Sequence, residues 1–162
     1  MMQVDNIFEM PGAYFFLMEL SAIYSDDIGA LGNVKLSAGY YLYFGSARGK
    51  GGMAARVRRH LKINKKRYWH VDWMTLAGSV KKVMLVPGGV ECELRRKASA
   101  LSGLTVPILG FGSSDCNQCP AHLLGVKGNG LTNLEELRLT VTGHSYSVTS
   151  FFSTTAAQPS TV

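Results

Sequence analysis

Apolar residues along this chain gather in a few blocks, and three of these blocks predict β-strands. Residues 13–20 are almost continuously apolar after the Pro11-Gly12 turn signal, which predicts a strand buried on both faces. Residues 40–44 are rich in aromatic side chains and predict a second strand, which pairs antiparallel with the first. Residues 80–86, closed by a Pro-Gly-Gly turn, predict a third strand.

A helix is predicted for residues 53–62, which contain no glycine or proline. Met53, Val57 and Leu61 recur every four residues and form one apolar stripe that can pack on a sheet. The opposite side of this helix is polar, and it carries Arg56, Arg59 and His60.

The other segments give weaker patterns. Residues 91–101 predict a second helix, because acids occupy the first turn and basic residues follow, as the helix dipole favours. Residues 70–76 fit a helix or a strand, and residues 21–32 predict a loop. Residues 140–162 are crowded with Ser and Thr and contain no charged residue, which predicts a poorly ordered tail, with a short edge strand at 146–152 as the alternative.

The chain is long enough for one well-buried domain. It has 162 residues, of which 46% are hydrophobic and 17% charged. We assign the domain to residues 1–126 and treat residues 127–162 as a C-terminal extension. Residues 1–10 lack the pattern of a signal peptide, and no apolar run approaches the roughly 20 residues of a membrane span. We therefore expect a soluble cytoplasmic protein with no membrane partner, and the odd number of cysteines fits a reducing compartment.

Positive charge is concentrated in one segment. Nine of the 17 Lys and Arg residues lie between Arg48 and Arg67, and no acid occurs between Asp27 and Asp72. Lys and Arg beside a phosphate backbone release condensed counterions, so such a segment favours nucleic acid as the partner, with a solvated basic loop as the alternative. The candidate phosphate contacts, called the basic block below, are Arg48, Lys50, Arg58, Arg59, Lys62, Lys65, Lys66 and Arg67.

Several residues could take part in phosphodiester hydrolysis, which needs an activated nucleophile and positive charge at the phosphate oxygens. Arg56 and His60 stand four apart on the predicted helix, so they share one face. The arginine could bind two phosphate oxygens, and the histidine could move a proton near neutral pH. Tyr14 and Tyr43 could activate water if a cation and arginines lower the tyrosine pKa, or they could simply pack in the core.

A metal ion could assist this chemistry. Mg²⁺ or Mn²⁺ needs one or two protein carboxylates when a substrate phosphate supplies further oxygens. Glu91 and Glu93 fall on different faces of the second helix, and we prefer Glu93 as the ligand. Alternatively, both acids only complement the positive end of the helix dipole.

Three cysteines allow a second metal site. Cys116 and Cys119 are separated by two residues and His122 follows, a set that can bind Zn²⁺. Cys92 and His144 are the available fourth ligands. The alternatives to a zinc site are a redox-active or accidental cysteine pair and buried reduced thiols. His70 and Asp72 could line a cleft or bind a second ion, although a hydrogen-bonded histidine packed near tryptophans is the simpler interpretation.

The order of these features resembles a known nuclease superfamily. Gly12-Ala13-Tyr14 opens the first strand and Tyr43-Phe44-Gly45 ends the second, and the helix with Arg56 and His60 follows. This arrangement resembles the GIY-YIG nucleases. Further blocks resemble a small archaeal and bacterial branch of that superfamily: Trp69-His70-Val71-Asp72, Glu91-Cys92-Glu93-Leu94, and Gly110-Phe111-Gly112-Ser113-Ser114-Asp115-Cys116.

The resemblance implies a compact α/β domain with a central three-stranded antiparallel sheet flanked by helices. It also implies that Tyr14 or Tyr43 helps to activate water, that Arg56 stabilises the phosphate, that His60 assists proton transfer and that Glu93 binds the metal.

We therefore expect a metal-dependent endonuclease that acts in DNA repair or processing, with DNA favoured over RNA. The alternatives are a catalytically inactive nucleic-acid-binding module of the same fold and a metal-stabilised interaction domain.

Overall fold

A long antiparallel strand, β1 (Gly12–Leu20), forms the centre of the fold in a computed structural model that describes residues 8–128, 146 and 147. It pairs along its whole length with β4 (Gly39–Ala47) on one side and with β5 (Ser79–Pro87) on the other. All but one of its residues are buried, as the continuous apolar run predicts. The three strands predicted from the sequence are confirmed, with the predicted antiparallel pairing of the first two.

The sheet is wider than predicted. Five antiparallel strands follow the order β6-β7-β4-β1-β5, where β6 is Leu104–Thr105 and β7 is Leu123–Val126. The two-residue strand β8 (Tyr146–Ser147) adds to the free edge of β5. The expectation of three strands is wrong because β6 and β7 are too short to give a clear sequence pattern, and they form through pairing with each other and with β4.

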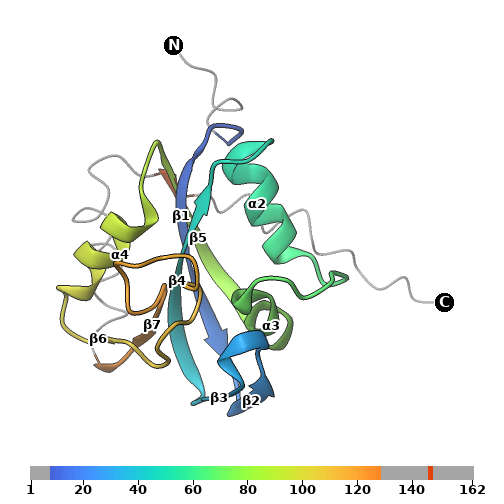
Figure 1. The fold of residues 1–162 in the computed structure, drawn as a ribbon, viewed down its shortest axis with the longest axis vertical. Helices are drawn as coiled ribbons and strands as arrows, with labels where there is room; N and C mark the ends of the chain where they lie inside the picture. Colours follow the sequence, from blue (N-terminus) through green and yellow to red (C-terminus); the bar gives the residue numbers. More distant parts are fainter. Residues whose placement is uncertain (1–7, 129–145, 148–162) are drawn as a thin grey trace.

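Helices cover both faces of the sheet and produce three layers (Figure 1). On one face, α2 (Gly52–Leu61) and α3 (His70–Ala77) pack through Met53, Val57 and Met74 against the even-numbered side chains of β1. On the other face, α4 (Glu91–Ser99) packs through Leu94 and Ala98 against the odd-numbered side chains. The two predicted helices are confirmed, and the ambiguous segment at 70–76 is helical.

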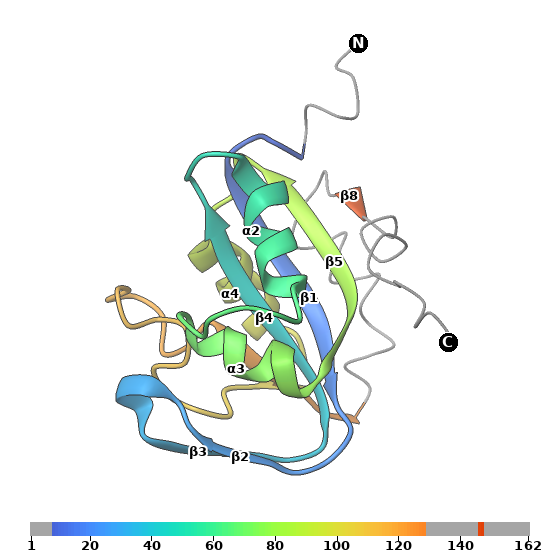
Figure 2. The same cartoon turned by 90° about the vertical axis from the view of Figure 1, so that its right-hand side faces the viewer.

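The connection from β1 to β4 is ordered rather than the predicted loop. It forms a hairpin of β2 (Tyr24–Asp27) and β3 (Asn33–Leu36), with the short 3₁₀ helix η1 (Gly29–Leu31) between them (Figure 2). Ile28, Val34 and Leu36 bury their side chains in the core that α2 and α3 also line. Polar residues at half-buried and exposed positions of β2, Ser25, Asp26 and Asp27, hid this strand from the sequence pattern.

Some of the predicted segments lie outside the described residues. Most of the Ser/Thr-rich tail lies there, and β8 occupies only the first two positions of the edge strand considered at 146–152. The domain boundary after residue 126 stays a prediction. Within the described part of the chain, no helix has the length and apolar composition to cross a bilayer.

Candidate active site

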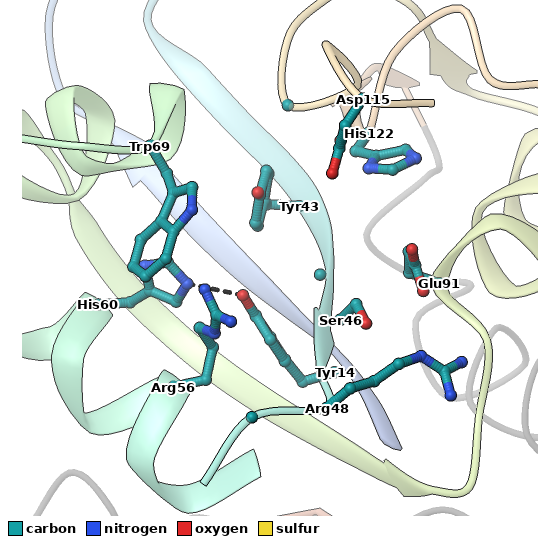
Figure 3. A pocket seen from close by; sticks show the side chains of 13 residues that line it. Tyr14, Tyr43, Ser46, Arg48, Arg56, His60, Trp69, Glu91, Asp115 and His122 are labelled. Carbon is teal, nitrogen blue, oxygen red and sulfur yellow. Dashed lines mark hydrogen bonds between the residues drawn. The ribbon is translucent and has the colours of Figure 1, made fainter. Parts of the chain in front are cut away.

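A polar cavity of about 260 Å³ opens between α2, β4, the start of α4 and the 106–122 segment that joins β6 to β7 (Figure 3). The fold brings four of the five predicted catalytic side chains to its wall: Tyr14, Tyr43, Arg56 and His60. Strands β1 and β4 supply the tyrosines, and α2 supplies the arginine and the histidine. The spacing of four along α2 places Arg56 and His60 on the face turned to this cavity.

Tyr14 and His60 form the closest pair in the site. The Tyr14 hydroxyl lies 2.6 Å from Nε2 of His60, and both side chains are buried (Figure 3). Neutral imidazole with its proton on Nδ1 accepts a hydrogen bond at Nε2, so this geometry lets the hydroxyl donate to the ring. A hydroxyl that already donates to an imidazole has a route by which its proton can leave.

Asp72 supports His60 from the side opposite Tyr14. Its Oδ1 lies 3.5 Å from Nδ1 of His60, without hydrogen-bond geometry, and its charge favours the proton on that nitrogen. The Asp72 carboxylate is fully buried, and it also binds Arg59 at 3.1 Å and the backbone N–H groups of Tyr68 and Trp69. Sequence reasoning did not assign this role, because the approach of α3 to α2 is a tertiary contact.

The Asp72 charge is fixed in place by these contacts. Burial alone would raise the pKa of Asp72, but the contacts with His60, with the two backbone N–H groups and with Arg59 outweigh it and hold the pKa well below its usual range. His60 responds in the opposite sense. Burial lowers the pKa of His60, and Asp72 only partly reverses that change, so the imidazole is neutral at neutral pH.

Both tyrosines have a raised pKa in the arrangement of protein groups that the structure shows. Burial raises the pKa of Tyr14 well above its ordinary value, and the neighbouring Tyr43 raises it further, although Arg56 acts in the opposite direction. Burial likewise raises the pKa of Tyr43. Tyr14 is therefore protonated in this state, and it can act as a base only by passing its own proton to His60.

A glycine makes room for the Tyr14 ring. Gly45 of β4 stands directly opposite Tyr14 of β1 in the sheet register. A Cβ atom at Gly45 would overlap the end of the Tyr14 ring, including its hydroxyl. Gly45 therefore allows the ring to lie across β4 and to reach His60.

Arginine and tryptophan form one wall of the cavity. The Arg56 guanidinium lies 4.2 Å from the centre of the Trp69 ring, and the Arg59 guanidinium lies at the same distance. Stacking on an aromatic face restricts the direction of a guanidinium while leaving its N–H groups available. Arg48 brings a second guanidinium to the cavity from the glycine-rich turn after β4.

Two carboxylates reach the cavity from the side opposite α2, and neither is Glu93. Glu91, the first residue of α4, and Asp115 of the 106–122 segment both line it (Figure 3). Glu93 is exposed and is not among the lining residues. The orientation of α4 decides which acid enters, because Leu94 and Ala98 bury one side of this helix against the sheet.

The basic block divides into two groups. Lys65 donates to the hydroxyl of Thr75 at 2.6 Å and lies 3.4 Å from Asp72, so it and Arg59 support the interior of the site. Another group is exposed to solvent, as nucleic-acid contacts require: Arg48, Lys50, Arg58, Lys62, Lys66 and Arg67. Arg67 also packs near the Trp73 ring, at 5.8 Å.

A second group of side chains lies beside the cavity. The metal-ligating atoms of Cys92, Cys116, Cys119 and His122 all lie within 4.8 Å of one another, so the structure contains a Cys₃His group that could hold a metal ion such as zinc. Burial raises the pKa of the Cys92 thiol, with Cys119 and Cys116 adding to the rise. Cys92 thus supplies the fourth side chain, and His144, the other sequence candidate, lies outside the described residues.

His70 does not line the cavity. Its Nδ1 accepts the backbone N–H of Gly112 at 3.0 Å, and its ring packs edge-on against Phe111. The hydrogen bond matches the simpler of the two interpretations offered from the sequence, but the aromatic partner is Phe111 rather than a tryptophan. His70 thereby connects α3 to the 106–122 segment.

The fold and this site define a three-layer α/β domain with a polar cavity that contains a tyrosine–histidine pair. The family profile described as "Domain of unknown function DUF123" matches residues 13–142. The match covers more than half of the sequence, so the chain belongs to this family. Comparisons with curated proteins and with solved structures gave no match.

Proposed function

We propose that the protein is a metal-dependent nuclease that hydrolyses phosphodiester bonds in nucleic acid, with DNA as the favoured substrate and DNA repair or processing as its setting. The observation that carries this proposal is the short Tyr14–His60 contact inside a cavity that also contains Arg56 and Glu91. Phosphodiester hydrolysis uses a proton acceptor, a guanidinium and a carboxylate, and all three line this polar cavity.

The carboxylates fit a hard divalent cation. Glu91 and Asp115 offer oxygen ligands at the wall of an open polar cavity, where water and phosphate oxygens can complete the coordination of Mg²⁺ or Mn²⁺. No salt bridge within the described residues occupies either carboxylate. A bound cation would supply positive charge for the phosphate and leaving oxygens. Glu91 replaces Glu93 as the proposed ligand.

The protein side chains move the proton. As water attacks, the tyrosine oxygen takes a proton from it while the Tyr14 hydroxyl proton passes to Nε2 of His60, so that a free tyrosinate, which the raised pKa of Tyr14 disfavours, does not form. The resulting hydroxide forms a bond to phosphorus as the bond to the leaving oxygen breaks. Water protonates that oxygen, and the hydroxide left from this water takes the extra proton from His60 and restores the site. Asp72 stabilises the imidazolium formed, because its charge lies 3.5 Å from Nδ1.

Arg56 binds the phosphate. Its guanidinium can donate two N–H groups to the non-bridging oxygens, and Trp69 limits how far it can turn away. Arg48 and the other exposed members of the basic block would hold the flanking phosphates. Backbone contacts of this kind position the substrate without reading its sequence.

The test is a cleavage and binding assay on labelled single-stranded, duplex, flapped and branched DNA and RNA. Each substrate is incubated with Mg²⁺, Mn²⁺ or a chelator, and Arg56→Ala is compared with Arg96→Ala, which changes an exposed arginine on α4. We expect metal-dependent cutting of at least one substrate, lost in Arg56→Ala and kept in Arg96→Ala. Salt-sensitive binding without cutting under either metal would instead establish the inactive binding module.

A further inference from the structure

We propose that Cys92, Cys116, Cys119 and His122 bind one structural Zn²⁺ ion, which holds the start of α4 and the Asp115 turn at the edge of the cavity. Three thiolates and an imidazole form a common tetrahedral zinc set. Ligand atoms around such an ion lie about 3.8 Å apart, given Zn–S bonds of about 2.3 Å. The Cys92 and Cys116 sulfurs are 3.5 Å apart, and Nε2 of His122 is 3.6 Å from the Cys92 sulfur.

The backbone around the cluster is arranged to present these ligands. The backbone N–H of Cys119 points to the Cys116 sulfur at 3.4 Å, a contact that favours a thiolate. Two hydrogen bonds fix the backbone of His122: its N–H donates to the Phe111 carbonyl, and its carbonyl accepts from the Phe44 N–H. The histidine ligand is therefore anchored to β4 before any ion binds.

A buried arginine provides an independent indication of the ion. Arg95 lies on α4, one turn after Cys92 and within electrostatic range of Cys119 and His122. Its side chain is buried, and its Nε has no hydrogen-bond partner among the described residues. A buried cation needs compensating negative charge. Zn²⁺ with three thiolates and a neutral imidazole carries a single negative charge, which would supply it.

The centre would also determine where the two cavity carboxylates lie. Glu91 immediately precedes Cys92, and Asp115 immediately precedes Cys116. Zinc would cross-link these two segments, which no salt bridge joins in the described part of the chain. Zinc binding itself does not depend on the proposed nuclease activity.

The first test uses the full-length wild-type chain. We expect about one zinc per chain by elemental analysis after purification without chelator, and a Co²⁺-substituted protein with the visible bands of a tetrahedral thiolate complex. Absence of zinc together with failure to bind Co²⁺ would overturn the proposal. A disulfide among the three cysteines, detected by mass spectrometry in freshly purified protein, would also overturn it.

Variants identify the fourth ligand. Cys92→Ser should weaken Co²⁺ binding and lower the thiolate-to-cobalt charge-transfer intensity by about a third, because one of three thiolates is lost. His144→Gln is the matched control and should leave the spectrum unchanged. If His144→Gln changed the spectrum and Cys92→Ser did not, His144 would be the ligand in place of Cys92, and the proposed ligand set would be overturned. If Cys92→Ser does not fold, the charge-transfer intensity of the wild-type protein still reports the number of thiolates.

The role of Arg95 has its own control on the same helix. Arg95→Met should weaken zinc affinity by about 10- to 100-fold, as expected for a group that supports metal ligands without touching the ion. Arg96→Met changes an exposed neighbour and should leave the affinity unchanged. Equal zinc affinities of Arg95→Met and Arg96→Met would show that Arg95 does not support this centre.

Hydrogen exchange tests the positioning role without any activity assay. Zinc removal should speed backbone exchange in α4 and in the 106–122 segment, while α2 and α3 keep their protection. Unchanged exchange in α4 would contradict the positioning role. If zinc binds as described but no nucleic acid is cleaved, the proposed function fails and the zinc centre stands.

Discussion

The two walls of the cavity are held in different ways. On the α2 and α3 side, the Tyr14–His60 pair rests on a buried carboxylate that binds Arg59, Lys65 and two backbone N–H groups. On the α4 side, Glu91 and Asp115 sit beside a cluster of thiols and lack salt bridges within the described residues. Protein contacts alone hold the side chains of the first wall in place. The carboxylates and thiols of the second wall are potential metal ligands, and bound metal ions would hold them in place.

The difference separates two tasks of the proposed hydrolysis. Proton transfer needs fixed distances between protein atoms, which the dense contacts around Asp72 provide. Charge stabilisation needs carboxylates that can accept a cation together with the substrate, which an open wall allows. Variants of the first wall should therefore affect chemistry and folding, and variants of the second wall should affect metal binding.

Removing the Tyr14 hydroxyl should have the largest effect on activity. Tyr14→Phe keeps the stacked ring but breaks the contact with His60, so cleavage should fall about 100- to 10,000-fold, as is typical when acid–base catalysis is lost. Substrate binding should be nearly unchanged. Single-turnover cleavage rates and a binding titration measure both quantities. Tyr43→Phe should cost less, and a larger loss there would transfer the proton-transfer role to Tyr43.

Neutralising Asp72 should have the largest effect on stability. Asp72→Asn leaves Arg59 and Lys65 without their buried partner, so the free energy of unfolding should fall by about 3 to 5 kcal/mol. Because the folded-state pKa of Asp72 is lowered, its contribution is present above the unfolded pKa and is lost progressively as pH falls from there through the folded-state pKa. Urea unfolding of both proteins at neutral and acidic pH checks this. The difference in the free energy of unfolding between the wild type and Asp72→Asn should shrink in acid. A difference that stays constant with pH would exclude a charge effect.

A methyl group at Gly45 should disturb the first wall from the β4 side. Gly45→Ala places a Cβ against the Tyr14 ring, so we expect a loss of about 1 to 3 kcal/mol in stability and reduced cleavage. Gly49→Ala provides the comparison, since a Cβ there meets no atom within 4 Å. Thermal unfolding should separate the two variants, whereas the cleavage rate of Gly45→Ala is compared with that of the wild type because Gly49 also lines the cavity. Equal behaviour would mean that Tyr14 does not depend on the space at Gly45.

The smallest effect concerns the exposed part of the basic block. Lys62→Ala should weaken nucleic-acid binding modestly on every sequence and lower the salt dependence by about one phosphate contact. Lys82→Ala, an exposed lysine on β5, should change neither quantity. Binding titrations at several salt concentrations measure the slope. Identical slopes for both variants would place the nucleic-acid surface away from α2.

The sequence pattern predicted the features that depend on local structure. The continuous apolar run at 13–20 and the spacing of Met53, Val57 and Leu61 gave the central strand and α2, and α2 placed Arg56 with His60. Tertiary contacts decided the rest. Strands β6 and β7 are too short to recognise, and the role of Asp72 depends on how α3 meets α2.

The choice between neighbouring residues also needed the structure. Glu91 and Glu93 are equivalent in sequence, and the packing of α4 decides that Glu91 lines the cavity. The sequence allowed a lowered pKa of Tyr14 beside a cation and arginines, but the burial that raises this pKa was not visible from the sequence. Cys92 could be named as a ligand candidate, yet its proximity to His122 depends on a contact between segments 30 residues apart.

The central claim is that a carboxylate on the α4 wall works with the Tyr14–His60 pair on phosphodiesters. The most direct test is the metal-dependent, single-turnover cleavage rate of Glu91→Gln beside that of Glu93→Gln, with binding and folding measured in parallel. We predict that Glu91→Gln loses cleavage while it keeps nucleic-acid binding, and that Glu93→Gln behaves as the wild type. Full cleavage by Glu91→Gln, or a loss confined to Glu93→Gln, would contradict this account.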